Sequence, residues 1–248
     1  MKKEISKALG LLFPPFCVHC KTLLPYSEES ALCPECQKLW DEEKRSVCKS
    51  CYKEVSECEC VPHRASKRIK KCFHVAEYDA ENDSVLRSIL INCKDHDYKY
   101  VYELAVNELE ALLRTRMRTL KNTVITYVPR KREKVMKFGV DQSLICAREL
   151  SKRLDIELVN AFRREGGREQ KALDSQERMN NAMASYSARE SAILAVNSRI
   201  VILYDDVVTT GASVSACAEL LKTMGARTVY VLCLGRTYPK GKKVEEIK

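Results

Sequence analysis

Residues 200–213 read IVILYDDVVTTGAS. Residues 198–206 predict a buried strand, with the apolar run Ile200–Leu203 at its centre and Asp205 and Asp206 at its carboxyl end. The segment Thr209–Ser213 then leads into a predicted helix over residues 212–224, which Gly225 ends. A loop that enters a helix N-terminus presents free backbone N–H groups and the positive end of the helix dipole, and both suit a phosphate group.

The side chains of this loop fit a phosphorylated sugar. The segment Thr209–Ser213 adds hydroxyl donors, and Gly211 within it lets the backbone approach a ligand closely. The adjacent carboxylates of Asp205 and Asp206 can accept hydrogen bonds from two neighbouring ribose hydroxyls, and they are oxygen ligands suited to a nearby Mg²⁺. An acid pair in another kind of α/β enzyme is the alternative, but it does not require the Thr-Thr-Gly-x-Ser tail. The chain has no G-x-x-x-x-G-K-[ST] motif, which argues against a P-loop nucleotide hydrolase.

Outward from this stretch, strand and helix patterns alternate. Further strands are predicted over residues 72–79, 121–129, 156–162 and 228–234. Helices are predicted over residues 83–118, 141–154 and 174–184. This alternation predicts an α/β fold with a mostly parallel sheet flanked by helices, and ligands on such sheets bind at the carboxyl ends of the strands.

The N-terminal part of the chain is rich in cysteine, with eight of the 13 cysteines in four close pairs. These pairs are Cys17 with Cys20, Cys33 with Cys36, Cys48 with Cys51, and Cys58 with Cys60. Two C-x-x-C knuckles can complete a tetrahedral Cys₄ zinc site, so the first two pairs predict a structural Zn²⁺. The other two pairs predict a second Cys₄ site, so we expect one or two zinc ions. The alternatives are a cross-braced arrangement, in which pairs that are not consecutive share an ion, the use of His63 or His19 as a ligand, and an iron–sulfur cluster.

Composition and charge limit the classes of protein to which the chain can belong. The formal net charge of +9 favours an anionic partner, although a solvated charged surface is the alternative. No stretch reaches the ~18 apolar residues of a membrane span, and residues 1–17 predict a short amphipathic helix rather than a signal peptide. Paired cysteines in an odd total predict metal ligation in a reducing cytoplasm. The five cysteines outside the pairs are predicted to be core residues: Cys72, Cys93, Cys146, Cys217 and Cys233.

The basic, polar stretch 61–71 is the expected domain boundary. It divides the chain into a small cysteine-rich zinc module, residues 1–70, and an α/β domain, residues 71–248.

The loop pattern resembles the phosphoribosyl pyrophosphate (PRPP) signature of type I phosphoribosyltransferases. The order of other residues resembles the ComF family, also called ComFC or GntX-like, in which a cysteine-rich zinc module precedes such a domain. The matching residues are Val128, Pro129, Ala147, Arg148, Leu150, Arg163, Arg164, Gln170, Leu173, Arg178, Asn181 and Tyr186. The chain departs from the family's Arg-Gly-Phe-Asn-Gln, which here reads Phe138-Gly139-Val140-Asp141-Gln142, with Lys137 adjacent.

The resemblance implies roles for individual residues. Asp205 and Asp206 would be the catalytic acids that bind the ribose hydroxyls, with Mg²⁺ accompanying PRPP. The PRPP-binding residues would be Val207, Val208, Thr209, Thr210, Gly211, Ala212 and Ser213, together with Arg130 and Lys131 in the segment positioned like a pyrophosphate loop. Arg178 and Asn181 would share one helix face, where local capping is the alternative to a role in the site. An active enzyme would transfer a phosphoribosyl group from PRPP to a nitrogen acceptor, which the sequence does not identify.

The resemblance also implies a biological setting. ComF-like proteins are implicated in natural competence, where they handle incoming single-stranded DNA in the cytoplasm beside a helicase and recombination proteins. Basic clusters at 64–71, 114–121, 130–137 and 163–168 would then contact the DNA backbone. Tyr98, Tyr100 and Tyr102 would stack on bases, or are ordinary packing residues. A PRPP-dependent transferase is the second hypothesis, and a zinc-dependent adaptor with a vestigial site is the third.

Overall fold

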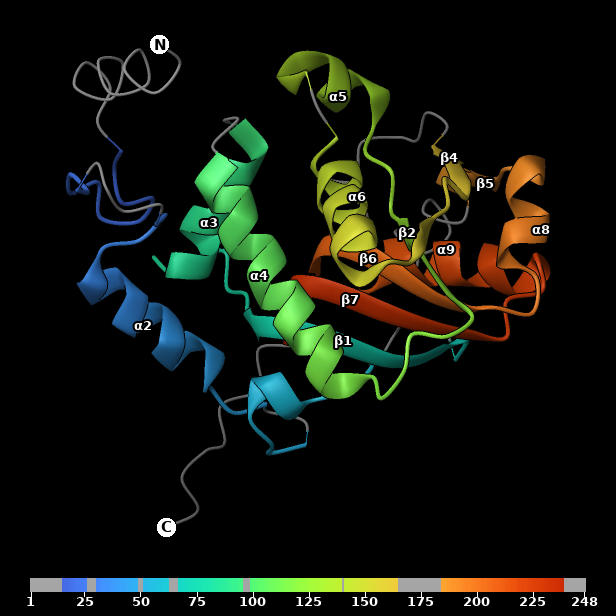
Figure 1. The fold of residues 1–248 in the computed structure, drawn as a ribbon, viewed down its shortest axis with the longest axis horizontal. Helices are drawn as coiled ribbons and strands as arrows, with labels where there is room; N and C mark the ends of the chain where they lie inside the picture. The colour runs from blue at the N-terminus through green and yellow to red at the C-terminus, as the bar shows by residue number, and fades with distance from the viewer. Residues whose placement is uncertain are drawn as a thin grey trace.

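The computed structural model describes residues 15–25, 30–48, 51–62, 67–95, 99–139, 141–164 and 184–238. A five-stranded sheet in the order β1-β7-β6-β2-β3 lies at its centre (Figure 1). The strands are β1 (Ile69–Glu77), β2 (Thr123–Tyr127), β3 (Glu157–Leu158), β6 (Ile200–Val208) and β7 (Thr228–Arg236). Every neighbouring pair is parallel, which confirms the predicted sheet.

Helices cover both faces of this sheet (Figure 1). The helices α3 (Val85–Asp95), α4 (Lys99–Arg116) and α6 (Gln142–Leu154) share one apolar cluster with one face of the sheet, and α9 (Ala212–Thr223) shares a second cluster with the other face. The middle of β6 is therefore buried on both sides, which explains its unbroken run of Val, Ile and Leu. The predicted long helical region 83–118 is two helices, α3 and α4.

The shorter elements complete the chain. They are α2 (Pro34–Lys44), η1 (Val55–Glu57), α5 (Arg132–Phe138), β4 (Phe162–Arg164), β5 (Tyr186–Ala188), η3 (Glu190–Ala192) and α8 (Ile193–Val196). The strand predicted over residues 156–162 is divided, because β3 joins the large sheet whereas β4 pairs with β5 in a separate antiparallel ribbon. Of the helix predicted at 174–184, only residue 184 lies within the described residues, and the first fourteen residues also lie outside them.

The N-terminal region packs against the α/β part of the molecule through α2. Trp40 is fully buried, and its Nε1–H donates to Glu108 Oε1 of α4 at 2.8 Å. Lys44 Nζ donates to the same carboxylate oxygen at 2.7 Å. The carboxylate of Glu43 accepts from the backbone N–H groups of Val85 and Leu86, which begin α3. A distant glutamate therefore satisfies donors at the start of α3 that a local cap would otherwise serve.

The five cysteines predicted to be core residues are all buried, as expected. Among the residues that the structure describes, no helix combines the length and the apolar character needed to span a bilayer. The division of the chain at residue 70 stays a prediction.

Candidate functional site

The loop after β6 turns sharply into the N-terminus of α9. Gly211 is the N-cap of α9 and has a positive φ of 81°, a conformation that glycine adopts without steric cost. Its carbonyl accepts from Ser215 Oγ at 2.6 Å, and Thr210 Oγ1 accepts from the Ala212 N–H at 3.4 Å. Thr209 is exposed, whereas Thr210 and the serine that follows Ala212 are half-buried. The turn therefore opens to solvent at the carboxyl edge of the sheet.

Asp205 and Asp206 belong to the last part of β6, as predicted, and the strand runs on for two residues to Val208. Asp205 Oδ1 accepts from the Asp206 N–H at 3.0 Å, and Asp206 Oδ1 accepts from the Val207 N–H at 2.8 Å. Successive side chains of a strand point to opposite faces of the sheet. The two carboxylates therefore do not lie side by side.

The surroundings of each acid agree with this alternation. Burial is the main cause that raises the pKa of the Cys217 thiol in α9, and the charge of Asp205 adds to it. On the other face, burial is the main cause that raises the pKa of Cys146 in α6 to about 12, and the charge of Asp206 contributes. Asp206 pairs with Arg130, and the alternation of side chains along β6 puts Asp205 on the other face of the sheet.

Arg130 meets Asp206 at the edge of the sheet. Its Nη2 lies 3.2 Å from Asp206 Oδ2, and both side chains are largely buried. The Arg130 N–H donates to Asp141 Oδ2 at 3.2 Å, while Asp141 Oδ1 accepts from the N–H groups of Ser143 and Leu144 at the start of α6. Asp141 thus caps α6 and positions the segment that carries Arg130. Lys131, the other predicted residue of this segment, is the N-cap of α5.

Arg164 and Tyr186 of the β4–β5 ribbon form a side of the site that the residue pattern alone did not identify. Arg164 Nη1 donates to the Pro129 carbonyl at 3.1 Å, and its guanidinium carbon lies 5.0 Å from the centre of the Tyr186 ring. Burial is the main cause that raises the pKa of Tyr186, whose hydroxyl has no hydrogen-bond partner among the described residues. The ribbon therefore contacts the segment after β2 through Arg164 and packs against α9 through β5.

In the sequence, only the resemblance to the ComF family pointed to Arg164 and Tyr186. Four other residues that the resemblance singled out lie outside the described residues: Gln170, Leu173, Arg178 and Asn181.

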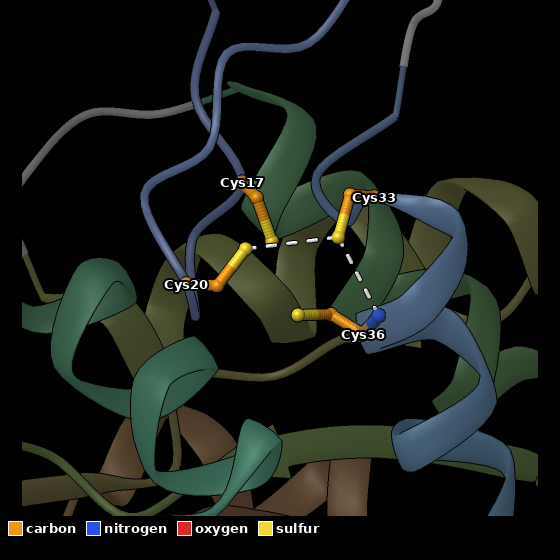
Figure 2. A group of neighbouring side chains, drawn as sticks. All are labelled: Cys17, Cys20, Cys33 and Cys36. Carbon is orange, nitrogen blue, oxygen red and sulfur yellow. Dashed lines mark hydrogen bonds between the residues drawn. The ribbon is translucent and has the colours of Figure 1, made fainter.

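The first two cysteine pairs form one group (Figure 2). The sulfur atoms of Cys17, Cys20, Cys33 and Cys36 all lie within 4.8 Å of one another. The Sγ atoms of Cys20 and Cys33 are 3.7 Å apart. A tetrahedral zinc–thiolate centre with Zn–S bonds of about 2.3 Å has S–S edges of about 3.8 Å, so the group fits a zinc ion. The side-chain hydrogen bond with Thr22 lowers the pKa of Cys20 to about 6.

The other two pairs form a second group, with Cys48, Cys51, Cys58 and Cys60 again within 4.8 Å of one another. The Cys60 N–H donates to Cys58 Sγ at 3.4 Å. Each group could therefore hold one zinc ion, and the cross-braced alternative is wrong. His19 contacts Ser88 Oγ through Nδ1 at 3.0 Å, and His63 lies outside the described residues.

The basic clusters are partly neutralised within the chain. Arg68 pairs with Glu219 at 3.3 Å, and Lys71 pairs with Glu59 at 2.8 Å. Tyr102 is buried, and its hydroxyl donates to the Cys93 carbonyl at 2.7 Å, so it is a packing residue. Tyr100 is exposed, and Tyr98 lies outside the described residues.

Several solved structures share part of this fold. The allosteric regulatory enzyme of purine biosynthesis is 16% identical over 58% of this chain and 30% of that chain, with a TM-score of 0.39, so the present chain spans about a third of its length. The purine phosphoribosyltransferase from Pyrococcus horikoshii Ot3 is 19% identical over 54% of this chain and 73% of that chain, with a TM-score of 0.34. A hypoxanthine phosphoribosyltransferase from Staphylococcus aureus is 14% identical over 61% of this chain and 73% of that chain, with a TM-score of 0.32.

No protein-family model matches the sequence, and no curated protein matches it. The molecule's own sheet and cysteine groups define its class of protein. The chain is an α/β protein with a parallel sheet flanked by helices and two N-terminal cysteine groups that could bind metal.

Proposed function

We propose that the chain binds a 5-phosphoribosyl ligand, PRPP, at the carboxyl end of β6 and is a ComF-like protein with a type I phosphoribosyltransferase-like domain. One observation carries this proposal. The last part of a strand inside the parallel sheet carries Asp205 and Asp206, and the turn after Val208 reaches the N-terminus of α9 through the left-handed Gly211. This arrangement supports the proposal, because carboxylates suit ribose hydroxyls and the amides of a helix N-terminus suit a phosphate.

Each part of the turn has a task in this proposal. The 5-phosphate lies at the N-terminus of α9, where the helix dipole and the hydroxyls of Thr210 and Ser213 stabilise its charge. The ribose lies across the end of β6, between the carboxylates of Asp205 and Asp206. Arg130 exchanges its contact with Asp206 for the pyrophosphate, because both partners offer anionic oxygens to the same guanidinium.

The reaction that this arrangement suits is transfer of the phosphoribosyl group to a nitrogen acceptor. A bond forms between the acceptor nitrogen and the anomeric carbon, and the bond from that carbon to the pyrophosphate oxygen breaks. Pyrophosphate leaves with the electron pair, and the acceptor's proton passes to Asp205 or to water. Arg130 stabilises the charge that develops on the leaving group. Bound Mg²⁺ would neutralise part of the pyrophosphate charge.

We propose single-stranded DNA as a second ligand. The protein would bind it in the cytoplasm during natural competence. The support for it is the resemblance to the ComF family and the net charge of +9. The ion pairs of Arg68 and Lys71 within the chain reduce the number of cations available to DNA.

Calorimetric titration with PRPP and Mg²⁺ tests the first proposal. Replacement of both acids, Asp205→Asn with Asp206→Asn, should weaken binding at least about tenfold, because two charged acceptors for ribose hydroxyls are lost. Asp155→Asn is the matched control, since Asp155 is exposed at the C-cap of α6 in a left-handed conformation that asparagine also tolerates.

The outcomes of this titration separate the two ligands. Absence of PRPP binding by the wild-type chain, with salt-sensitive binding of single-stranded DNA, would remove the first proposal. Tight PRPP binding with no affinity for DNA would remove the second. Release of pyrophosphate in the presence of nitrogen acceptors would identify an active transferase.

A further inference from the structure

The second cysteine group packs against the end of β7. Arg236, the last residue of that strand, donates through Nη1 to the Cys60 carbonyl at 2.6 Å and to Cys58 Sγ at 3.9 Å. The hydroxyl of Tyr238 donates to the same sulfur at 3.9 Å and contacts His74 Nε2 at 2.7 Å. The guanidinium carbon of Arg236 lies 4.7 Å from the centre of the Tyr238 ring. The side chains of Arg236 and Tyr238 therefore both contact the second cysteine group.

Arg236 is a buried charge that needs a counter-charge. Arg236 is only 3% exposed. Among the described residues, no carboxylate lies within ion-pair distance of its guanidinium group. An unpaired buried guanidinium would be strongly unfavourable. Four cysteine thiolates around a Zn²⁺ carry a net negative charge, so a metal-loaded second group supplies the missing partner. The donors that converge on Cys58 Sγ are those expected around a metal-bound thiolate.

The backbone of the same residues borders the proposed phosphoribosyl loop. Arg236 is the partner of Val208 in the parallel ladder between β7 and β6. The Thr237 N–H donates to the Val208 carbonyl at 3.0 Å. Thr209, the first residue of the turn, follows Val208 directly. A displacement of the end of β7 would therefore also displace the backbone of Val208, the residue directly before the turn.

We propose that Arg236 and Tyr238 couple the metal of the second cysteine group to the loop Asp205–Ser213. With the metal present, Arg236 holds the end of β7 in place and the turn is ordered for its ligand. With the metal lost, Arg236 loses its counter-charge, the end of β7 loosens and ligand binding weakens. The ligand part of this inference rests on the proposed phosphoribosyl function, whereas the link from metal to loop order does not.

Arg236→Met in the full chain tests the metal side of the coupling. It removes the charge and both donors to the cysteine group, so one zinc ion should be released to a colorimetric chelator about 10- to 100-fold faster than from the wild type. Tyr238→Phe should speed the release of the same ion to a smaller extent and keeps the packing of the ring. Arg199→Met is the matched control, because Arg199 pairs with Glu157 at the opposite end of β6. Release rates equal to the wild type in both Arg236→Met and Tyr238→Phe would overturn the inference.

Hydrogen exchange tests the loop side without any ligand. Cys58→Ser removes one ligand of the second group, and peptides over residues 205–213 should exchange faster than in the wild type. Cys17→Ser, which disrupts the first group, should leave these peptides unchanged. Unchanged exchange in Cys58→Ser, after zinc analysis has shown the loss of one ion, would overturn the coupling.

PRPP affinity completes the test. Cys58→Ser should bind PRPP at least about fivefold more weakly than Cys17→Ser, within the range of ordinary coupling between two sites. If the wild type binds no PRPP but loses loop protection with its zinc, the coupling stands and the proposed function falls. If PRPP binds equally to both variants, the proposed function stands and the coupling falls.

Discussion

Replacing Gly211 with alanine directly tests the proposal that the turn before α9 binds a phosphate. Gly211 has a φ of 81°, where a β-carbon costs about 1–2 kcal/mol because it approaches the following carbonyl oxygen. For a chain of this size, a loss of 1–2 kcal/mol lowers the melting temperature by about 2–8 °C. The variant should therefore fold, with a modest and measurable loss of stability.

The effect on binding should exceed the effect on stability. To relieve the strain, the backbone at residue 211 has to rotate, which turns the amides at the start of α9 away from the phosphate. A hydrogen bond to a charged group contributes about 1.5–3 kcal/mol, so the loss of one such bond weakens binding at least about tenfold. Calorimetry with ribose 5-phosphate measures this loss, and thermal unfolding measures the stability of the same samples.

Gly225 offers a matched control at the other end of α9. It also has a positive φ, 87°, and an added β-carbon would lie 2.3 Å from Asn197 Oδ1. The twelve residues of α9 separate the two glycines by about 18 Å. Gly225→Ala should lose at least as much stability as Gly211→Ala and keep the wild-type affinity for ribose 5-phosphate. Equal affinities in the two variants would refute the role of the Gly211 turn.

Three further outcomes are expected. Elemental analysis of protein purified in reducing buffer should find two zinc ions per chain, and Cys17→Ser should lower the count while Cys146→Ser, a change in the core, should not. Glu108→Gln should destabilise the chain by about 1–3 kcal/mol in denaturant unfolding, because the carboxylate accepts from both Trp40 and Lys44, and no loss of stability would contradict the importance of this contact. Burial, with the charge of Arg236 as a second cause, lowers the pKa of His74 to about 3. Its pKa in the unfolded chain is about 6.5, so the unfolded chain binds the extra proton and stability should fall as the pH drops below about 6.5. His74→Gln should show a flatter stability profile between pH 7 and 5, and parallel profiles would contradict the assignment.

The local patterns of this sequence were informative because each describes a few consecutive residues. The apolar run before Asp205 predicted a buried strand, and the strand is present. The segment 141–154 predicted a helix, which the structure has as α6 with Asp141 as its cap. The cysteine pairs predicted metal-binding knuckles, and their sulfur atoms gather in two groups. In each case, backbone preference and side-chain chemistry within one short segment suffice.

The predicted ends of strands and the predicted undivided elements were less accurate. The predicted strand ended at Asp206, whereas β6 continues to Val208 because its pairing with β7 continues that far, and no local signal in the sequence indicates a partner strand. The region 156–162 divides because Glu157 joins the large sheet while Phe162 joins the β4–β5 ribbon. Both differences come from neighbours that are distant in the sequence.

The sequence by itself determined the strand, turn and helix that would receive a phosphate, and the identity of the thiol ligands. Only the tertiary structure decided that Arg130 meets Asp206 and that Arg236 lies against Cys58. The physical reason is that a local pattern sets backbone conformation, whereas the meeting of two side chains far apart in the chain depends on strand order and register, which the packing of the whole sheet selects.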